Sequence, residues 1–262
     1  MNKLLTILTV CKNSEETIGD CLRSSIDYDD VEHLVIDGNS SDKTVSIVRD
    51  LIIERPHISL FQENEAKGIY SALNLGFSLA KGKYIIILNS DDQLVNFSSL
   101  YNAIKFTNAD IVVGRQLGVI GKNSLVTIGY RFPASLPLIK MPWPHGSMIV
   151  KKDFFDLIGN YSTTYRLSSD LDWVNKALNT SPNIEYLDYN ISKFVFGGVS
   201  TTSLYGPVES FLIFRSYGGS ATKGILNLIK AITIKVMAKI IGWENIFRLK
   251  KILKLRTGIW HS

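Results

Sequence analysis

The chain has 262 residues, of which 45% are hydrophobic and 20% are charged, and its formal net charge is +5. Such a chain can bury a core, as one large domain or as one domain with an appendage. Cys11 and Cys21 are the only cysteines, and no Cys/His cluster has metal-binding spacing. The sequence therefore implies neither a disulfide framework nor a zinc site, and it fits a reducing compartment. No run of eighteen apolar residues is free of charge, and the N-terminal MNKLLTILTV lacks a small-residue cleavage site. We therefore expect neither a membrane span nor a secretion signal.

The first part of the chain alternates between predicted strands and predicted helices. Runs of β-branched and aliphatic residues predict strands at 4–10, 31–36, 58–61 and 84–88. Periodic apolar residues predict helices between them, at 14–25, 42–54 and 69–81. We expect Ser14 to cap the first helix and Ile69 to lie on the buried face of the third. This order of elements is typical of a parallel sheet with helices on its faces.

The fourth predicted strand, YIIIL, is apolar throughout, and it stops abruptly at Asn89, Ser90, Asp91 and Asp92. A short apolar run of this kind is typical of a strand buried on both faces of a parallel sheet. Ligands of open α/β sheets lie beyond the carboxyl ends of the strands. Two adjacent carboxylates repel each other there unless a cation lies between them, and Mg²⁺ or Mn²⁺ suits such oxygen ligands. The alternative is that both acids only cap the next helix.

Polar loops also follow the first two predicted strands, so several polar clusters converge on one edge of the sheet. The sequence contains neither the GxGxxG dinucleotide fingerprint nor the GxxxxGK[ST] phosphate loop. Asp37, which ends the second strand, can instead accept hydrogen bonds from a base or a ribose. Such an edge fits a nucleotide. The carboxylate would hold its base or ribose at one end, and a metal ion would hold its diphosphate at the other.

Together, the motifs TVCKN, VIDGNSSDKT, KGIYSALNLG and LNSDD resemble the N-terminal half of a family-2 glycosyltransferase. The resemblance continues in the right order through HGSMIVKKDFF, SSDLDW and FGGVS. It implies an inverting enzyme that uses a nucleotide-diphosphate sugar, similar to bacterial enzymes that build surface polysaccharides. The fold implied is α/β, of the GT-A class, with a mostly parallel central sheet, helices on both faces and, in this chain, a C-terminal helical tail.

The resemblance also implies roles for residues at the sheet edge. Asp91 and Asp92 match the metal motif, which grips the diphosphate through Mn²⁺ or Mg²⁺. Asn89 stands where the family often has an acid, so only two carboxylates remain in this motif. The residues implied in donor binding are Thr9, Lys12, Asn13, Asp37, Lys67, Tyr70, Asn74 and Asp91. The three residues near the start of the helix predicted at 69–81 also have non-functional interpretations. Lys67 can be a solvated charge, Tyr70 a half-buried aromatic and Asn74 a surface amide.

The second half is expected to carry the acceptor site and the catalytic base, on strands predicted at 109–116, 125–131 and 147–150 and a helix from Ser169. Inverting transfer is a single displacement in which one carboxylate takes the proton of the acceptor hydroxyl. By the resemblance this base is Asp170, whereas Asp172 fits better as an acid favoured by the helix dipole. His145 is expected to face the site, with a core histidine as the alternative. A flexible loop over the phosphates is expected from Gly197, Gly198 and Ser200.

The C-terminal region is strongly basic, because nine Lys or Arg and one Glu lie between 223 and 262, whereas the rest of the chain is slightly acidic. Lysines interrupt its apolar runs, and Trp243 and Trp260 are candidate anchors at a membrane interface. We therefore expect a glycosyltransferase domain at 1–205 and a basic amphipathic helical tail at 206–262 that binds an anionic membrane surface. The alternative is that two helices pack on the domain and leave their lysines in water.

The absence of the QxxRW motif of processive synthases favours transfer of a single sugar. We expect a UDP- or GDP-sugar as donor, a glycan or lipid-linked glycan as acceptor, and a cytoplasmic enzyme that is peripheral at the inner face of the cell membrane. A sugar-nucleotide pyrophosphorylase would need a glycine-rich, basic loop after its first strand, and a non-catalytic nucleotide-sugar-binding module would lack Asp170. No nucleic-acid partner is expected, since the domain shows no basic, aromatic-lined groove.

Overall fold

The computed structural model describes residues 3–65, 67–121, 124–130, 132 and 135–252. The strands are β1 Lys3–Cys11, β2 Val31–Asp37, β3 Ile58–Gln62, β4 Gly82–Ile87, β5 Gln93–Leu94, β6 Ile111–Ile120, β7 Ser124–Ile128, β8 Met148–Lys151 and β9 Ile184–Val195. The helices are α1 Ile18–Arg23, α2 Thr44–Glu54, α3 Ile69–Leu79, α4 Phe97–Phe106, α5 Lys152–Ile158, α6 Ser169–Leu178, α7 Val199–Thr202, α8 Tyr205–Ser216 and α9 Ala221–Ile252, with a 3₁₀ turn, η1, at His145–Ser147.

Within the described residues, nine strands form one sheet in the order β3-β2-β1-β4-β8-β6-β9-β5, and β7 pairs with β6. The first four strands are parallel, as predicted. β8 then runs antiparallel to both β4 and β6, and β9 lies parallel to β6. In the parallel part, Cys11 pairs with Asp37, and Asp37 pairs with Gln62. The carboxyl ends of these strands therefore meet at one edge, which is where the predicted polar clusters lie.

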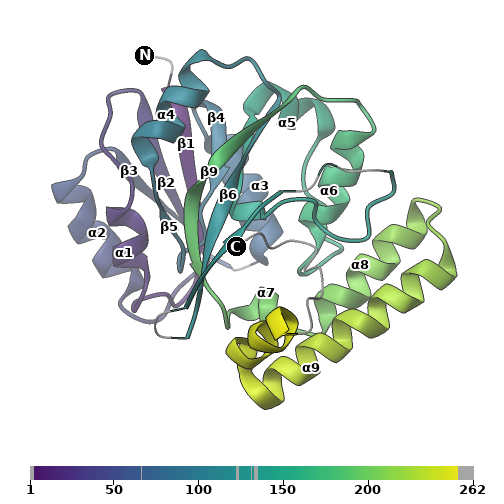
Figure 1. The fold of residues 1–262 in the computed structure, drawn as a ribbon. Coiled ribbons are helices and arrows are strands. Elements are labelled where there is room, and N and C mark those ends of the chain that lie inside the picture. The colour runs from purple at the N-terminus through teal and green to yellow at the C-terminus, as the bar shows by residue number, and fades with distance from the viewer. Residues whose placement is uncertain (1–2, 66, 122–123, 131, 133–134, 253–262) are drawn as a thin grey trace.

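Helices cover both faces of the sheet (Figure 1). Ile85 and Ile87 of β4 pack in one core together with residues of α3, α5 and α6. Tyr84 and Ile86, which point to the opposite face, pack with residues of α1 and α4 in a second core. Successive side chains of a strand point to opposite faces, so β4 is apolar throughout because both of its faces are buried, as the sequence predicts.

Two predicted helix boundaries and one predicted buried residue were wrong. The first helix begins at Ile18 instead of 14, because Asn13 has a left-handed backbone (φ 51°) and the Ser14 carbonyl closes a turn with the amides of Thr17 and Ile18. The third helix ends at Leu79, since the next residue is extended. Its Ile69 is 44% exposed, and Tyr70 is buried in its place.

The C-terminal helices α8 and α9 form an antiparallel pair beside α6 (Figure 1). α9 breaks at Gly242, whose φ of 80° is a left-handed conformation that favours glycine. Beyond this break the ring of Trp243 packs on Phe196, with ring centroids 5.5 Å apart. Trp243, a candidate membrane anchor, is thus half-buried against the domain. Trp260, the other candidate anchor, and Arg131, the end of the strand predicted at 125–131, lie outside the described residues. Across the described part of the chain, no helix has both the length and the apolarity to cross a membrane.

Candidate active site

The loops after β1 and β2 are joined by hydrogen bonds. The backbone amide of Asn13 donates to Ser40 Oγ (2.8 Å), and Asn13 Oδ1 accepts from the amide of Ser41 (2.9 Å). Asp37 is fully buried, and its two carboxylate oxygens accept hydrogen bonds from the hydroxyl (2.5 Å) and the amide (3.0 Å) of Ser40. Lys12 is exposed beside this pair of loops. Three of the predicted donor residues, Lys12, Asn13 and Asp37, are thus brought together at the edge.

Thr9 is not at this surface. Its side chain is fully buried, and Thr9 Oγ1 lies 2.9 Å from His33 Nε2, on the neighbouring strand. The His33 Nδ1 atom lies 3.1 Å from Ser25 Oγ, so the two side chains belong to an internal polar chain under the loops. Burial lowers the pKa of His33 to about 3, so this imidazole is neutral in the folded protein.

The two acids after β4 have very different environments. Asp91 is exposed, whereas Asp92 is only 3% exposed and accepts a hydrogen bond from Asn89 Nδ2 at 2.9 Å. Burial and the nearby charge of Asp91 raise the pKa of Asp92 to about 7. A carboxylate in such a place is costly to ionise unless a cation lies beside it.

Two glycines approach these acids from distant parts of the chain. A Cβ atom on Gly146 would lie 3.5 Å from Asp92 Oδ2 and 2.8 Å from Gln116 Nε2. A Cβ atom on Gly198 would lie 3.5 Å from Asp91 Oδ2. The predicted loop at 197–200 therefore reaches Asp91, and Gly197 gives it a left-handed turn (φ 126°). The side chain of Ser200 lies outside the described part of the structure.

The donor set is compatible with Mg²⁺ or Mn²⁺. Among the described residues no group of three or more His, Cys, Asp or Glu is placed to hold a metal ion. Asp91 and Asp92 can supply two carboxylates, and Mg²⁺ commonly binds through one or two carboxylates and completes its shell with phosphates and water. The buried Asp92 is the observation that favours a cation here, since a bound cation would offset the cost of its charge.

The predicted residues around α3 separate into two environments. Lys67 is exposed before the helix, where its charge opposes the burial that raises the pKa of Glu63. Asn74 instead forms two hydrogen bonds with the backbone of Tyr161, both 2.9 Å long. Asn74 Nδ2 donates to the Tyr161 carbonyl, and the Tyr161 backbone amide donates to Asn74 Oδ1. Asn74 is thus a positioning residue that holds the segment before α6 against α3.

A second cluster lies around Asp170, at the start of α6. The hydroxyl of Tyr70 donates to Asp170 Oδ1 at 3.3 Å, and the Tyr70 and Tyr161 rings lie 5.6 Å apart. The Tyr161 hydroxyl lies 3.3 Å from His145 Nε2. Burial lowers the pKa of His145, while the charge of Asp170 opposes this. Tyr161 was not predicted as a site residue, because a single tyrosine in a loop carries no motif.

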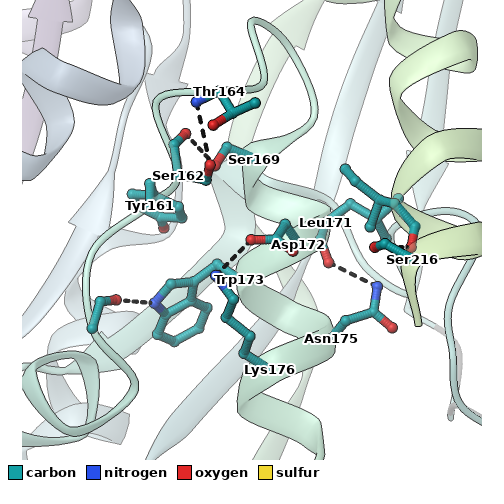
Figure 2. Close-up of polar contacts among 12 residues, drawn as sticks. Tyr161, Ser162, Thr164, Ser169, Leu171, Asp172, Trp173, Asn175, Lys176 and Ser216 are labelled. Atoms are coloured by element: carbon teal, nitrogen blue, oxygen red, sulfur yellow. Dashed lines mark hydrogen bonds and ion pairs between the residues drawn. The ribbon is translucent and has the colours of Figure 1, made fainter.

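Asp172 points away from this cluster. Figure 2 shows Asp172 and Lys176 directed at each other along α6, and their ion pair is 2.7 Å long. Asp172 Oδ1 also accepts a hydrogen bond at 2.9 Å from the hydroxyl of Tyr217, which directly follows α8. The neighbouring Trp173 donates its indole N–H to the Gly159 carbonyl at 2.8 Å (Figure 2). These contacts fasten α6 to α8 and to the segment before it, and they leave Asp170 as the acid beside the tyrosines.

The two clusters are joined by the adjacent residues His145 and Gly146. His145 contacts Tyr161 in the Asp170 cluster, whereas Gly146 lies against Asp92 in the acidic pair. One dipeptide therefore spans from the candidate metal ligands to the candidate base. A site with a metal-bound leaving group on one side and a proton acceptor on the other has the components that a group transfer needs.

Sequence comparison relates this chain to known enzymes. The model of glycosyl transferase family 2 matches residues 6–168. The PGL/p-HBAD biosynthesis glycosyltransferase of Mycobacterium bovis is 26% identical over 179 residues, which cover 66% of this chain and 69% of that protein. The UDP-Glc:alpha-D-GlcNAc-diphosphoundecaprenol beta-1,3-glucosyltransferase WfaP of Escherichia coli is 30% identical over 112 residues, 42% of this chain and 43% of that protein.

Solved structures resemble the fold over most of the chain. S. aureus TarS 1-349 in complex with UDP-GlcNAc matches with a TM-score of 0.64 and 16% identity, over 87% of this chain and 71% of that one. The mannosyltransferase PcManGT from Pyrobaculum calidifontis, in complex with GDP-Man and Mn²⁺, matches with a TM-score of 0.63 and 15% identity, over 98% of this chain and 82% of that one. The fold is GT-A, as predicted, and the chain belongs to glycosyl transferase family 2.

Proposed function

We propose that this enzyme transfers a single sugar, with inversion, from a UDP- or GDP-sugar to a glycan or lipid-linked glycan during polysaccharide synthesis. The observation that carries the proposal is the dipeptide His145–Gly146, which joins the Asp91 and Asp92 pair to the Asp170 cluster. Relatives support the donor and acceptor classes: WfaP is named for a UDP-glucose donor and a diphosphoundecaprenol-linked acceptor. PcManGT was solved with GDP-Man and Mn²⁺.

In this proposal each side chain has a distinct task. Asp37, Lys12 and Asn13 hold the nucleoside end of the donor, and Thr9 supports their loops from within. Asp91 and Asp92 would hold Mn²⁺ or Mg²⁺, which when bound neutralises charge on the leaving diphosphate. Asp170 accepts the proton of the acceptor hydroxyl as that oxygen attacks the anomeric carbon.

Phosphate contacts from Lys67 and from the loop with Gly197, Gly198 and Ser200 complete the proposed donor site. Gly198 lies against Asp91, which supports a role for this loop in contacting a metal-bound diphosphate. A glycine there allows the backbone to approach the ligand closely.

The experiment is a thermal-stability screen with UDP, GDP and their sugars, each with Mn²⁺, with Mg²⁺ and with EDTA. A ligand that binds only the native state raises the melting temperature. We expect one nucleotide to stabilise the protein when metal is present and not when EDTA is present. Absence of stabilisation by every nucleotide with either metal would contradict the donor assignment. Inversion is tested separately, by the anomeric configuration of the product.

We also propose that α8 and α9 bind an anionic membrane surface, with the protein at the inner face of the cell membrane. Six apolar side chains of α9 are exposed at helical spacing: Ile225, Leu226, Ile229, Val236, Met237 and Ile240. Lys223, Lys230 and Lys239 are exposed on the same helix. An apolar stripe with flanking lysines is typical of helices that lie in a membrane interface.

A further inference from the structure

A pocket of about 400 Å³ lies between α6, α8, α9 and the segment before η1. Asp170 lines it from the first turn of α6, and most of the other lining side chains are apolar, including Leu167, Leu171, Phe211 and Leu228. A pocket of this volume is of the size that holds a small organic molecule. Because Asp170 belongs to its wall, the pocket begins where the proposed base meets an acceptor.

Three polar side chains of the wall, Ser168, Ser210 and Asn227, lie within hydrogen-bond distance of other groups of the protein. Ser168 Oγ donates to the Gly206 carbonyl at 3.2 Å and lies 3.5 Å from Ser210 Oγ. Asn227 Nδ2 donates to the Lys223 carbonyl at 2.9 Å. A bare sugar needs a partner for each buried hydroxyl, whereas a hydrocarbon segment needs only the apolar surface that this wall offers.

Two lysines from different elements line the same pocket, Lys140 before η1 and Lys235 on α9. Asp170 is the acid among the lining residues. Burial lowers the pKa of Lys235, because the charged ammonium loses hydration there. An anion in the pocket would favour the charged form of this lysine, so the wall is complementary to a molecule that is both apolar and negatively charged.

We propose that this pocket binds the acceptor as an anionic amphiphile. The acceptor's hydroxyl-bearing end lies at Asp170, a phosphate lies by Lys140 and Lys235, and the first part of a hydrocarbon chain packs on Phe211 and Leu228. This inference rests on the proposed function, since Asp170 is taken there as the base. It makes α8 and α9 part of the acceptor site as well as a surface for the membrane.

The test uses the full chain with EDTA present, so that phosphate cannot bind through a metal at Asp91 and Asp92. Calorimetry compares three probes: decyl phosphate below its micelle concentration, the uncharged decyl glucoside, and inorganic phosphate. We expect decyl phosphate to bind at least about tenfold more tightly than either other probe, because only it contacts both the lysines and the apolar wall.

Variants then locate the binding. Lys235→Ala and Lys140→Ala should each weaken decyl phosphate about tenfold, the loss of one charged contact, and leave decyl glucoside unchanged. Lys235→Arg should retain binding because it keeps the charge. Phe211→Ala should weaken both alkyl probes. Lys105→Ala is the control, since Lys105 is exposed on α4, does not line the pocket and is remote from the proposed membrane surface of α9.

The proposal is overturned if decyl glucoside or inorganic phosphate binds as tightly as decyl phosphate, or if both lysine-to-alanine variants bind it as wild type does. UDP binding with Mn²⁺ is measured on the same samples. A protein that binds UDP and not decyl phosphate refutes the pocket assignment alone. A protein that binds decyl phosphate and no nucleotide supports the pocket as an amphiphile site and refutes the proposed donor chemistry.

Discussion

The hydroxyl of Tyr70 donates a hydrogen bond to Oδ1 of Asp170, 3.3 Å away and 100 residues later in the chain. The amide of Leu171 donates to the same oxygen at 2.9 Å. Among the described residues, none donates to the other oxygen, Oδ2. Asp170 is therefore held through Oδ1, and in the proposed mechanism Oδ2 is the oxygen that would take the proton of the acceptor.

The first prediction concerns this carboxylate. Asp170→Asn keeps the shape of the side chain and removes the proton acceptor, so turnover should fall by about 10² to 10⁴. The affinity for the donor nucleotide should change little. Asp172→Asn is the matched control on the same turn, and it should lower thermal stability by breaking the pair with Lys176 while it retains most activity. If Asp170→Asn is active and Asp172→Asn is inactive, Asp172 is the base and Asp170 is the structural acid.

The second prediction tests Tyr70 as a positioning residue. Tyr70→Phe removes one hydrogen bond to Asp170, which is worth about 1 kcal/mol, so kcat should fall about fivefold with an unchanged KM for the donor. Tyr101→Phe is a suitable control, because the Tyr101 hydroxyl also donates to a carboxylate, that of Asp30 at 3.0 Å, on another part of the domain. Equal changes of kcat in Tyr70→Phe and Tyr101→Phe would show that Tyr70 has no specific role in positioning Asp170.

The third prediction separates metal binding from stability. The pKa of Asp92 is raised by burial and by Asp91. The stability that the neutral acid confers is therefore present at low pH and is lost as pH rises through about 7. At pH 8 without metal, Asp92→Asn should melt at a higher temperature than wild type, because it removes a buried charge. The same variant should lose metal-dependent UDP binding in calorimetry.

Asp91→Ala should lose the same binding without the gain in stability, because Asp91 is exposed. A variant of either acid that binds UDP and Mn²⁺ as wild type does would show that the residue is not a ligand. Both acids are compared in the same buffer, so a general change in folding is visible as a change in melting temperature.

The order of strands and helices could be predicted as far as the fourth strand because it depends on local apolar patterns. Alternation along β1 also places Thr9 on the same face as the buried Ile7, which indicates that its side chain points inward. The sequence around Asn74 could not reveal its contact with Tyr161, since the two lie 87 residues apart. Nor does the motif LNSDD distinguish the exposed Asp91 from the buried Asp92, because their burial depends on segments near 146 and 198.

The fourth prediction concerns the pH dependence of stability. His33 has a folded-state pKa of about 3, below its ordinary value of 6.5. The unfolded chain therefore binds a proton that the folded chain does not, and stability should fall as pH decreases below about 6.5. Between pH 6.5 and 5 this amounts to about 2 kcal/mol.

His33→Gln is the variant that tests this, because it retains polar atoms near Thr9 and Ser25 and cannot take up the proton. It should be less stable than wild type at pH 7.5 and should lose less stability on going to pH 5, as measured by urea unfolding at each pH. Parallel pH curves for the two proteins would show that His33 does not contribute to the acid sensitivity.

The last prediction concerns the exposed face of α9. Lys230 and Lys239 are exposed on this helix. They flank an apolar stripe on the helix surface that includes Ile240, which is 75% exposed. Each lysine near an anionic surface contributes about 1 kcal/mol, so Lys230→Ala with Lys239→Ala should weaken binding to phosphatidylcholine vesicles that contain phosphatidylglycerol about thirtyfold. Ile229→Ser should also weaken it, because less apolar surface is buried in the interface. Lys83→Ala with Lys105→Ala is the matched control, as both lysines are exposed on other elements. Co-sedimentation is the measurement, and it should decrease with added salt for wild type. If the α9 variants sediment as wild type does, the helices serve packing and the acceptor pocket alone, because their lysines then lie in water rather than at lipid phosphates.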